Sequence, residues 1–479
     1  MKPTRTKPMQ RRTGLLLILI ALPLVLLSTA TTASAQVCAS LTLTTQAQVN
    51  AVSCSSVTGT LSINGPDITD LSPLSSVTSV GGDLLIESNT VLTNTGGLGG
   101  ITSVVGDLEI FNNPALTNLD GLAAVTSVGG DLYIAGNPAL PNVDGLAAVT
   151  SVGELLYINF NSALTNLDGL AAVISVGGDL RIASNGALTN VDGLAAVTSV
   201  GGFLRIRDND AVTNVDGLAA VTSVGGNLQI YFNPALTNVD GLGGITSVGG
   251  GNLYISNNNA LPNLDGLAAV TSVGSSLVIQ NNPVLTNLDG LAAVTSVGGT
   301  LHIDGNTVLT NLDGLAAITS VGGSLEIYSS TVLTNLDGLA AITSVGGSLQ
   351  IQNNPVLTNL DGLAAVTSVG QLVYIFSNLA LTNLDGLAGI TSVDLSLFIL
   401  DNTVLTEFCG LFPLLDAGGL SGGYTVTGNA INPTEAEILA GGACPPLTVP
   451  ALGPVGIALL LAALGATAYW RLRGSASAA

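Results

Sequence analysis

Residues 116–137 read LTNLDGLAAVTSVGGDLYIAGN, and close copies of this stretch follow one another along the 479-residue chain. The Asp-Gly pair inside it recurs every 24 residues, except for one step of 25 that contains an extra glycine in 249–251. Self-similarity at a fixed period of this length is typical of solenoids, in which each repeat contacts its neighbours. The aspartates of the pair are Asp120, Asp144, Asp168, Asp192, Asp216, Asp240, Asp265, Asp289, Asp313, Asp337, Asp361 and Asp385.

The end of each copy predicts a short strand. In 131–135 the apolar residues Leu132 and Ile134 alternate with Tyr133, so the first two should point inward and the tyrosine outward. Glycines precede this segment and Asn137-Pro138 follows it, as turns require. Stacked copies would bury a continuous core of Leu, Ile and Val, with parallel strands about 4.8 Å apart. We therefore predict an all-β parallel solenoid of 24-residue coils, and the remainder of each copy as a coil with several corners rather than a helix.

The copies also resemble a known repeat. Residues 116–122, 126–134 and Asn137 are similar to the repeat of receptor L-domains, the leucine-rich-repeat-like β-helical modules of receptor ectodomains. The resemblance extends over residues 59–408. It implies a right-handed parallel β-solenoid that serves binding and not catalysis.

Both ends of the chain look like targeting segments. Residues 1–35 have a basic start, an apolar run and an Ala-Ser-Ala cleavage site, as in a secretory signal peptide. Residues 449–479 combine a proline motif, the uncharged run 452–470 and a basic tail, which predicts one transmembrane helix. This tripartite end resembles the IPTL-CTERM and PEP-CTERM sorting signals that an exosortase-like enzyme reads. The matching residues are Pro450, Leu452 and Gly456.

These segments predict an exported protein of the cell envelope or cell surface, anchored at least transiently in a membrane. A plain membrane anchor without processing is the alternative for the C-terminal segment. Four cysteines flank the repeats, and an exported chain can oxidise them. Proximity along the chain favours Cys38–Cys54 in an N-terminal cap, 36–58, and Cys409–Cys444 in a C-terminal cap, 409–448.

Charge and composition exclude several classes of function. The formal net charge is −21, and between the basic ends of the chain only Arg181, Arg205 and Arg207 are cationic. Phosphate binding needs dense Lys and Arg, so nucleic acid is excluded as a partner. The chain has one histidine, His302, and shows no nucleophile elbow or phosphate-binding loop. We expect no catalytic activity, no cofactor and no metal site, and an exposed His302 on the strand face.

Three ladders of polar residues run along the predicted rod. One begins at Asn89 and Asn113 and a second at Asn94 and Asn118, and both predict structural hydrogen bonds, to the neighbouring coils and to turn backbone. The Asp ladder is open to two interpretations. Each aspartate could cap its turn by accepting backbone N–H groups, or the row could bind Ca²⁺.

The outward strand positions differ from coil to coil, although the copies are otherwise nearly identical. Most tyrosines and all three arginines between the termini fall there, and these residue types anchor binding patches. We predict a non-catalytic surface protein that binds an unknown protein or glycan through this face. The alternatives are a structural envelope spacer and an ice-binding solenoid, because Thr recurs in rows. The predicted ligand-binding residues are Tyr133, Tyr157, Arg181, Arg205, Arg207, Tyr231 and Tyr254.

Overall fold

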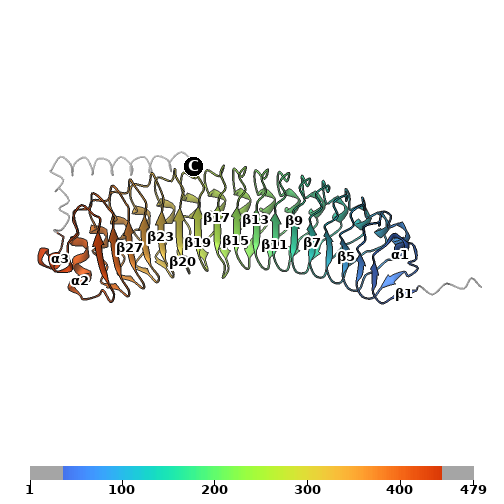
Figure 1. Ribbon diagram of the computed structural model, residues 1–479, viewed down its shortest axis with the longest axis horizontal. Helices are drawn as coiled ribbons and strands as arrows, with labels where there is room; N and C mark the ends of the chain where they lie inside the picture. The colour runs from blue at the N-terminus through green and yellow to red at the C-terminus, as the bar shows by residue number, and fades with distance from the viewer. Residues whose placement is uncertain (1–35, 445–479) are drawn as a thin grey trace, which may run out of the picture.

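A computed structural model describes residues 36–444 as a long, gently curved rod of stacked coils (Figure 1). The helix α1 (Gln46–Asn50) lies at the N-terminal end, and α2 (Phe412–Asp416) and α3 (Glu435–Gly441) lie at the other. Cys38 is bonded to Cys54 and Cys409 to Cys444, the pairing that chain proximity favoured. One disulfide therefore lies at each end of the rod.

A parallel sheet runs along the whole rod. Equivalent residues face each other in adjacent coils, so that Leu132 pairs with Leu156 and Ile134 with Ile158. The pairing is linear and open, with β2 and β30 at its two edges. Its strands are β2 (Leu41–Leu43), β4 (Leu61–Ile63), β5 (Leu84–Glu87), β6 (Leu108–Phe111), β7 (Leu132–Ala135), β9 (Leu156–Asn159), β11 (Leu180–Ala183), β13 (Leu204–Arg207), β15 (Leu228–Tyr231), β17 (Leu253–Ser256), β19 (Leu277–Gln280), β21 (Leu301–Asp304), β23 (Leu325–Tyr328), β25 (Leu349–Gln352), β27 (Val373–Phe376), β29 (Leu397–Leu400) and β30 (Tyr424–Thr427).

A second parallel sheet forms at the Thr-Ser-Val corner of the coils. Isolated bridges from Val57 through Val80, Val104 and Val128 to Val152 extend it toward the N-terminus. The bridge at Val57 joins this sheet to the pair β1 (Val37–Cys38) with β3 (Ser56–Val57) in the N-terminal cap. The strands of the second sheet are β8 (Ser151–Val152), β10 (Ser175–Val176), β12 (Ser199–Val200), β14 (Ser223–Val224), β16 (Ser247–Val248), β18 (Ser272–Val273), β20 (Ser296–Val297), β22 (Ser320–Val321), β24 (Ser344–Val345), β26 (Ser368–Val369) and β28 (Ser392–Val393).

The third side of each coil is a short 3-10 turn, which the sequence analysis did not anticipate. The Asp-Gly-Leu segment closes it through a hydrogen bond such as that from Ala195 N to Asp192 O. These turns are η1 (Ser72–Ser76), η2 (Gly96–Leu98), η3 (Asp120–Leu122), η4 (Asp144–Leu146), η5 (Asp168–Leu170), η6 (Asp192–Leu194), η7 (Asp216–Leu218), η8 (Asp240–Leu242), η9 (Asp265–Leu267), η10 (Asp289–Leu291), η11 (Asp313–Leu315), η12 (Asp337–Leu339), η13 (Asp361–Leu363), η14 (Asp385–Leu387) and η15 (Cys409–Leu411).

The core is the interior of this three-sided tube. Leu132 and Ile134 are fully buried, and so are their counterparts in the neighbouring coils, which confirms the inward direction predicted for them. The corner residues of the same coil, Leu122, Val125 and Val128, are at most 1% exposed. One continuous apolar column therefore fills the rod from cap to cap.

The long sheet continues into both expected caps. Strand β2 lies within 36–58 and pairs with β4, and β30 lies within 409–448 and pairs with β29. The caps therefore supply the two edge strands of the sheet as well as the disulfides. The right-handed winding and the boundaries at 59 and 408 stay predictions.

A buried asparagine ladder ties the coils together. At Asn185, for example, the main-chain N–H donates to Asn209 Oδ1 at 3.0 Å, and the side-chain Nδ2 donates to Ile158 O at 3.1 Å. The ladder residues are fully buried and cannot bond to water, so the hydrogen bonds to neighbouring coils satisfy their polar atoms. The structural role predicted for this row is confirmed. Its members are Asn89, Asn113, Asn137, Asn161, Asn185, Asn209, Asn233, Asn258, Asn282, Asn306, Asn354, Asn378 and Asn402.

Ser330 interrupts this ladder. It is fully buried, and its hydroxyl turns back to the carbonyl of Tyr328 at 3.2 Å. Asn306, in the coil before it, is the one ladder asparagine whose main-chain N–H does not reach a side-chain oxygen of the next coil. We expect Ser330→Asn to restore that bond and raise the free energy of unfolding by about 1–2 kcal/mol. Urea denaturation followed by circular dichroism measures the gain, and a decrease would show that the site has no room for the amide.

Several predictions lie outside the described residues. They are the signal peptide 1–35, the transmembrane run 452–470 and the sorting residues Pro450, Leu452 and Gly456. Between residues 36 and 444, no helix has both the length and the apolar character that a membrane span needs.

Candidate functional site

The predicted ligand-binding residues lie together on the outer face of the long sheet. We call Tyr133, Tyr157, Arg181, Arg205, Arg207, Tyr231 and Tyr254 the strip. Tyr133 pairs with Tyr157, Tyr157 with Arg181 and Arg181 with Arg205 in adjacent coils. Arg207 pairs with Tyr231, and Tyr254 lies in the next coil opposite Gln229. The register of a parallel sheet therefore joins the strip into one surface over six successive coils.

The strip side chains are half-buried rather than fully exposed, because each lies against its counterpart in the next coil. The rings of Tyr133 and Tyr157 have centroids 5.2 Å apart, and Phe111 meets Tyr133 edge-on at 6.1 Å. Tyr231 and Tyr254 pack edge-on at 5.5 Å. Two aromatic groups thus flank the arginines.

Small outward residues beside the strip are covered by it. Ala135, Asn159 and Ala183 point to the outer face, yet they are at most 6% exposed. The outward strand positions are therefore not all open to solvent. Asn159 pairs with Ala135 and Ala183 in the sheet, and its Nδ2 donates to the hydroxyl of Tyr157 at 2.5 Å, so a larger strip side chain lies over this short residue.

The arginines form a charged centre between the two aromatic groups. Arg181 pairs with Asp179 and Arg207 with Asp208, and Arg205 Nε donates to Gln229 Oε1 at 2.7 Å. The guanidinium of Arg181 also lies 5.8 Å from the ring centre of Phe203, a cation–π distance. If exposed Asp210, three residues after Arg207, is counted with Asp179 and Asp208, the centre of the strip has three aspartates for three arginines and a net charge close to zero.

Two buried polar atoms of this region lack a hydrogen-bond partner within residues 36–444. They are Asn159 Oδ1 and Arg181 Nε, an acceptor and a donor in adjacent coils. Native structures leave few such atoms, so each marks a place whose hydrogen bonding is incomplete. Both belong to the strip or its direct neighbours.

Toward the N-terminus the same face is acidic. Burial raises the pKa of Glu109, and the nearby carboxylates of Asp107, Glu87, Asp131 and Asp83 raise it further. No cation of the described chain lies among them, because its three arginines are all on the strip. The electrostatic potential of the face therefore changes from negative to nearly neutral between Glu109 and Arg181.

Two further surface residues escaped the sequence analysis. Phe160 and Phe232 directly follow strands β9 and β15, and both have a left-handed backbone, with φ of 53° and 55°. That conformation costs an ordinary residue about 1–2 kcal/mol. The same position in the other coils holds Ser, Asn, Asp or Gly, and this contrast between copies was the signal available in the sequence.

The Asp ladder does not cap its turns. Within the described coils no side-chain carboxylate of these aspartates accepts a backbone N–H at its 3-10 turn, so the capping interpretation is wrong. Instead the asparagine two residues earlier accepts the N–H of the aspartate, as Asn190 Oδ1 does from Asp192 at 3.0 Å. The second asparagine row thus supplies the cap, and the carboxylates stand in solvent. Calcium binding by the row stays untested.

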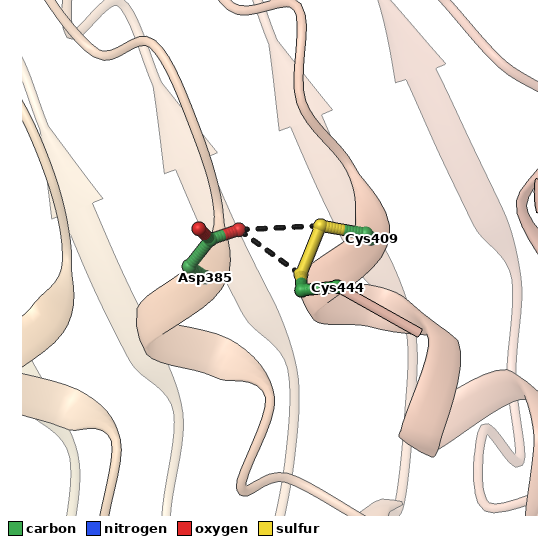
Figure 2. A group of neighbouring side chains, drawn as sticks. All are labelled: Asp385, Cys409 and Cys444. Carbon is green, nitrogen blue, oxygen red and sulfur yellow. Dashed lines mark hydrogen bonds between the residues drawn. A yellow bond between two sulfur atoms is a disulfide. The ribbon is translucent and has the colours of Figure 1, made fainter. Parts of the chain in front are cut away.

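The last aspartate of the ladder has a different environment. Asp385 Oδ1 lies 3.3 Å from Cys409 Sγ and 3.1 Å from Cys444 Sγ, as Figure 2 shows. This is the one group of three potential metal ligands in residues 36–444. Both sulfurs are engaged in the disulfide and cannot act as thiolate ligands, so the group does not form a metal site in this state.

The environment of Asp385 predicts a pH-dependent stability effect. Burial raises its pKa above 3.8, and the charges of Glu407 and Asp361 add to the shift. A raised pKa means that this carboxyl stabilises the fold when protonated and that this contribution is lost as the pH rises through the folded-state pKa. Asp385→Asn should therefore increase stability at pH 7, by less than about 1 kcal/mol because solvent screens the half-exposed group.

Thermal unfolding between pH 3 and 7 tests this, with the exposed ladder member Asp313→Asn as the control. The gain for Asp385→Asn should shrink as the pH falls toward 3.8. A stability gain that is constant with pH, or equal in Asp313→Asn, would contradict a raised pKa at Asp385.

The single histidine is less exposed than expected. His302 Nδ1 lies 2.8 Å from Glu326 Oε2, and the imidazole packs edge-on against Tyr328 at 5.3 Å. Its side chain is only 16% exposed. Its place on the strand face is as predicted, but neighbouring side chains cover it.

No family model and no curated protein sequence matches the chain. Among solved structures, an internalin from Listeria monocytogenes is similar over 73% of this chain and 79% of its own, with 16% identity and a TM-score of 0.38. A likeness this distant has no bearing on function. The chain is a leucine-rich parallel β-solenoid, as its own strand register establishes. The resemblance to receptor L-domains stays a prediction.

Proposed function

We propose that this protein is a non-catalytic repeat protein of the cell envelope or surface that binds a ligand through the strip. The observation that carries the proposal is that the variation between coils is concentrated at the outer strand positions and the residues next to them. The core, the 3-10 turns and the asparagine ladders barely change between coils, whereas the outer strand positions change in nearly every coil. The fold therefore does not dictate those residues.

The composition of the strip supports binding. Tyrosine and arginine are the residues most often found at the energetic centre of interfaces, and here they form one surface instead of lying scattered. The described chain has no other arginine and no lysine. A spacer without a ligand has no need to concentrate its cations among aromatic rings.

Ice binding is the weaker alternative. Pro141, Pro262 and Ile174 interrupt the threonine rows. The hydroxyls are also engaged within the protein, since Thr126 Oγ1 donates to Thr102 O at 3.2 Å and Thr150 Oγ1 to Thr126 O at 3.1 Å. Their protons are then not available to ice. Absence of thermal hysteresis would agree with this.

The test uses glutamine substitutions, because Gln229 and Gln350 already occupy the same column of the sheet. We expect Tyr133, Tyr157, Arg181 and Arg205, all changed to Gln, to abolish binding on glycan and protein arrays while the circular dichroism spectrum stays that of a folded solenoid. The matched control changes the same column elsewhere, at Val278, Glu326, Tyr374 and Phe398, and should keep binding. If the strip variant binds as well as the control variant and the wild type, the site lies outside the strip.

A further inference from the structure

Phe160 and Phe232 are exposed in a backbone conformation that disfavours them. Their side chains are large and apolar, yet 62% and 49% of their surfaces are open to solvent. Both have a left-handed backbone, which Gly, Asn and Asp adopt more readily. The other left-handed residues at this position are Ser88, Asn112, Gly136, Ser184, Asp208, Asn257, Asn281, Gly305, Ser329, Asn353, Ser377, Asp401 and Gly428.

Folding does not explain these two residues. An exposed ring buries little apolar surface, so its burial offsets little of the free-energy cost of the left-handed backbone. The other strongly exposed apolar side chains of residues 36–444 are Val, Ile and Leu, and none of them has this backbone. A strained, exposed aromatic residue is therefore better explained by contact with a ligand.

Their position connects them to the strip. Phe160 follows Asn159 at the end of β9, and Phe232 follows Tyr231 at the end of β15, with the rings of Tyr231 and Phe232 5.8 Å apart. They are three coils apart along the rod, which is about 14 Å at the spacing of parallel strands. They thus stand at the edge of the strip, on either side of its arginines.

The surface beside Phe232 is shaped to receive polar groups. It is a shallow hollow lined by three successive coils, with the carboxylates in the coil before Phe232 and the amides in the coil after it. The hollow is lined by Asp208, Asp210, Phe232, Pro234, Asn257 and Asn259. Carboxylates accept hydrogen bonds, and side-chain amides both donate and accept them, so the hollow suits a ligand rich in hydroxyl groups.

We propose that Phe160 and Phe232 are stacking platforms for a neutral oligosaccharide that lies along the edge of the strip. The C–H face of a sugar ring packs on an aromatic ring, and its hydroxyls can bond to the carboxylates and amides of the hollow. This proposal rests on ligand binding by the strip and names the class of ligand.

Charge favours a neutral sugar chain over the alternatives. The described chain carries 31 acidic side chains against three arginines, so an anionic polymer is repelled along most of the rod. A neutral glycan meets no such repulsion. A protein partner would bury the carboxylate of Asp210, which lies beside Phe232 and forms no ion pair within residues 36–444, and a buried carboxylate needs a partner to offset its desolvation.

The test is a double variant of the exported full-length protein, Phe160→Asn with Phe232→Asn. Asparagine accepts the left-handed backbone, so Tm should rise, by about 2 °C. Binding to cello-, xylo-, manno- and maltohexaose, measured by titration calorimetry, should weaken at least tenfold for the hexaose that wild type binds. Ile174→Thr is the control, because it removes an exposed apolar side chain from another side of the coil.

Opposite changes in stability and binding support the proposal. Unchanged hexaose affinity in the double variant overturns it. Wild-type binding to polygalacturonate alone, or to arrayed proteins alone, also overturns it. If the quadruple glutamine variant of the strip loses this binding to polygalacturonate or protein, the proposed function stands and only the ligand class is wrong. If the strip variant keeps it, the proposed function fails as well.

Discussion

Gly193→Ala should destabilise the solenoid by about 4 kcal/mol or more, the largest effect that we expect from one methyl group. Gly193 is the middle residue of the turn η6 and is buried against the coil before it. A Cβ atom there would lie far inside van der Waals contact of the carbonyl oxygen and carbon of Leu167. Both are main-chain atoms, which cannot rotate away, so the two coils would have to separate.

Gly250→Ala is the matched control, because a Cβ atom there meets nothing within 4 Å. It should change the free energy of unfolding by about 0.5 kcal/mol or less. Urea denaturation of both variants gives the comparison. Equal stabilities would mean that the coils are not stacked as closely at the Asp-Gly-Leu turns as the structure has them.

Asn209→Leu should cost about 3 kcal/mol, the second largest effect. Asn209 is fully buried, its Oδ1 accepts the N–H of Asn185 at 3.0 Å, and its Nδ2 donates to Ile182 O at 3.0 Å. Leucine has a similar volume but leaves these buried groups without the amide. The loss is therefore one of hydrogen bonding and not of packing.

The control for this variant is the same substitution in the outer asparagine row. Asn214 is half-buried, and its Oδ1 accepts the N–H of Asp216 at 3.1 Å. Asn214→Leu removes a turn cap that water can partly replace, so it should cost about 1 kcal/mol. If the two variants lose the same stability, the inner ladder contributes no more than an ordinary cap.

The sequence predicts the long sheet well because its alternation is strong in every copy. Successive side chains of a strand point to opposite faces, so the apolar Leu132 and Ile134 must point inward and Tyr133 outward. The second sheet is harder to predict, since a two-residue strand such as Ser151–Val152 is too short to show an alternating pattern. The 3-10 turns were missed for a similar reason, because three residues contain no helical period.

The candidate site was predictable in its position but not in its detail. The strip follows from the alternation and the period, which bring Tyr133 and Arg205 onto one surface. The choice between aspartate and asparagine as the turn cap was open, because both side chains can accept an N–H. The burial of Asn159 depends on how larger side chains such as Tyr157 pack around it, which the alternation alone does not reveal.

Radical footprinting of tyrosine on the full-length protein tests the central claim most directly, because the chain carries tyrosines both on and off the strip. With the ligand found on the arrays bound, we predict protection of Tyr133, Tyr157, Tyr231 and Tyr254, with Tyr374 and Tyr424 unchanged as internal references. Protection of the reference tyrosines alone, or no change at the four strip tyrosines while ligand is bound, would contradict binding through the strip.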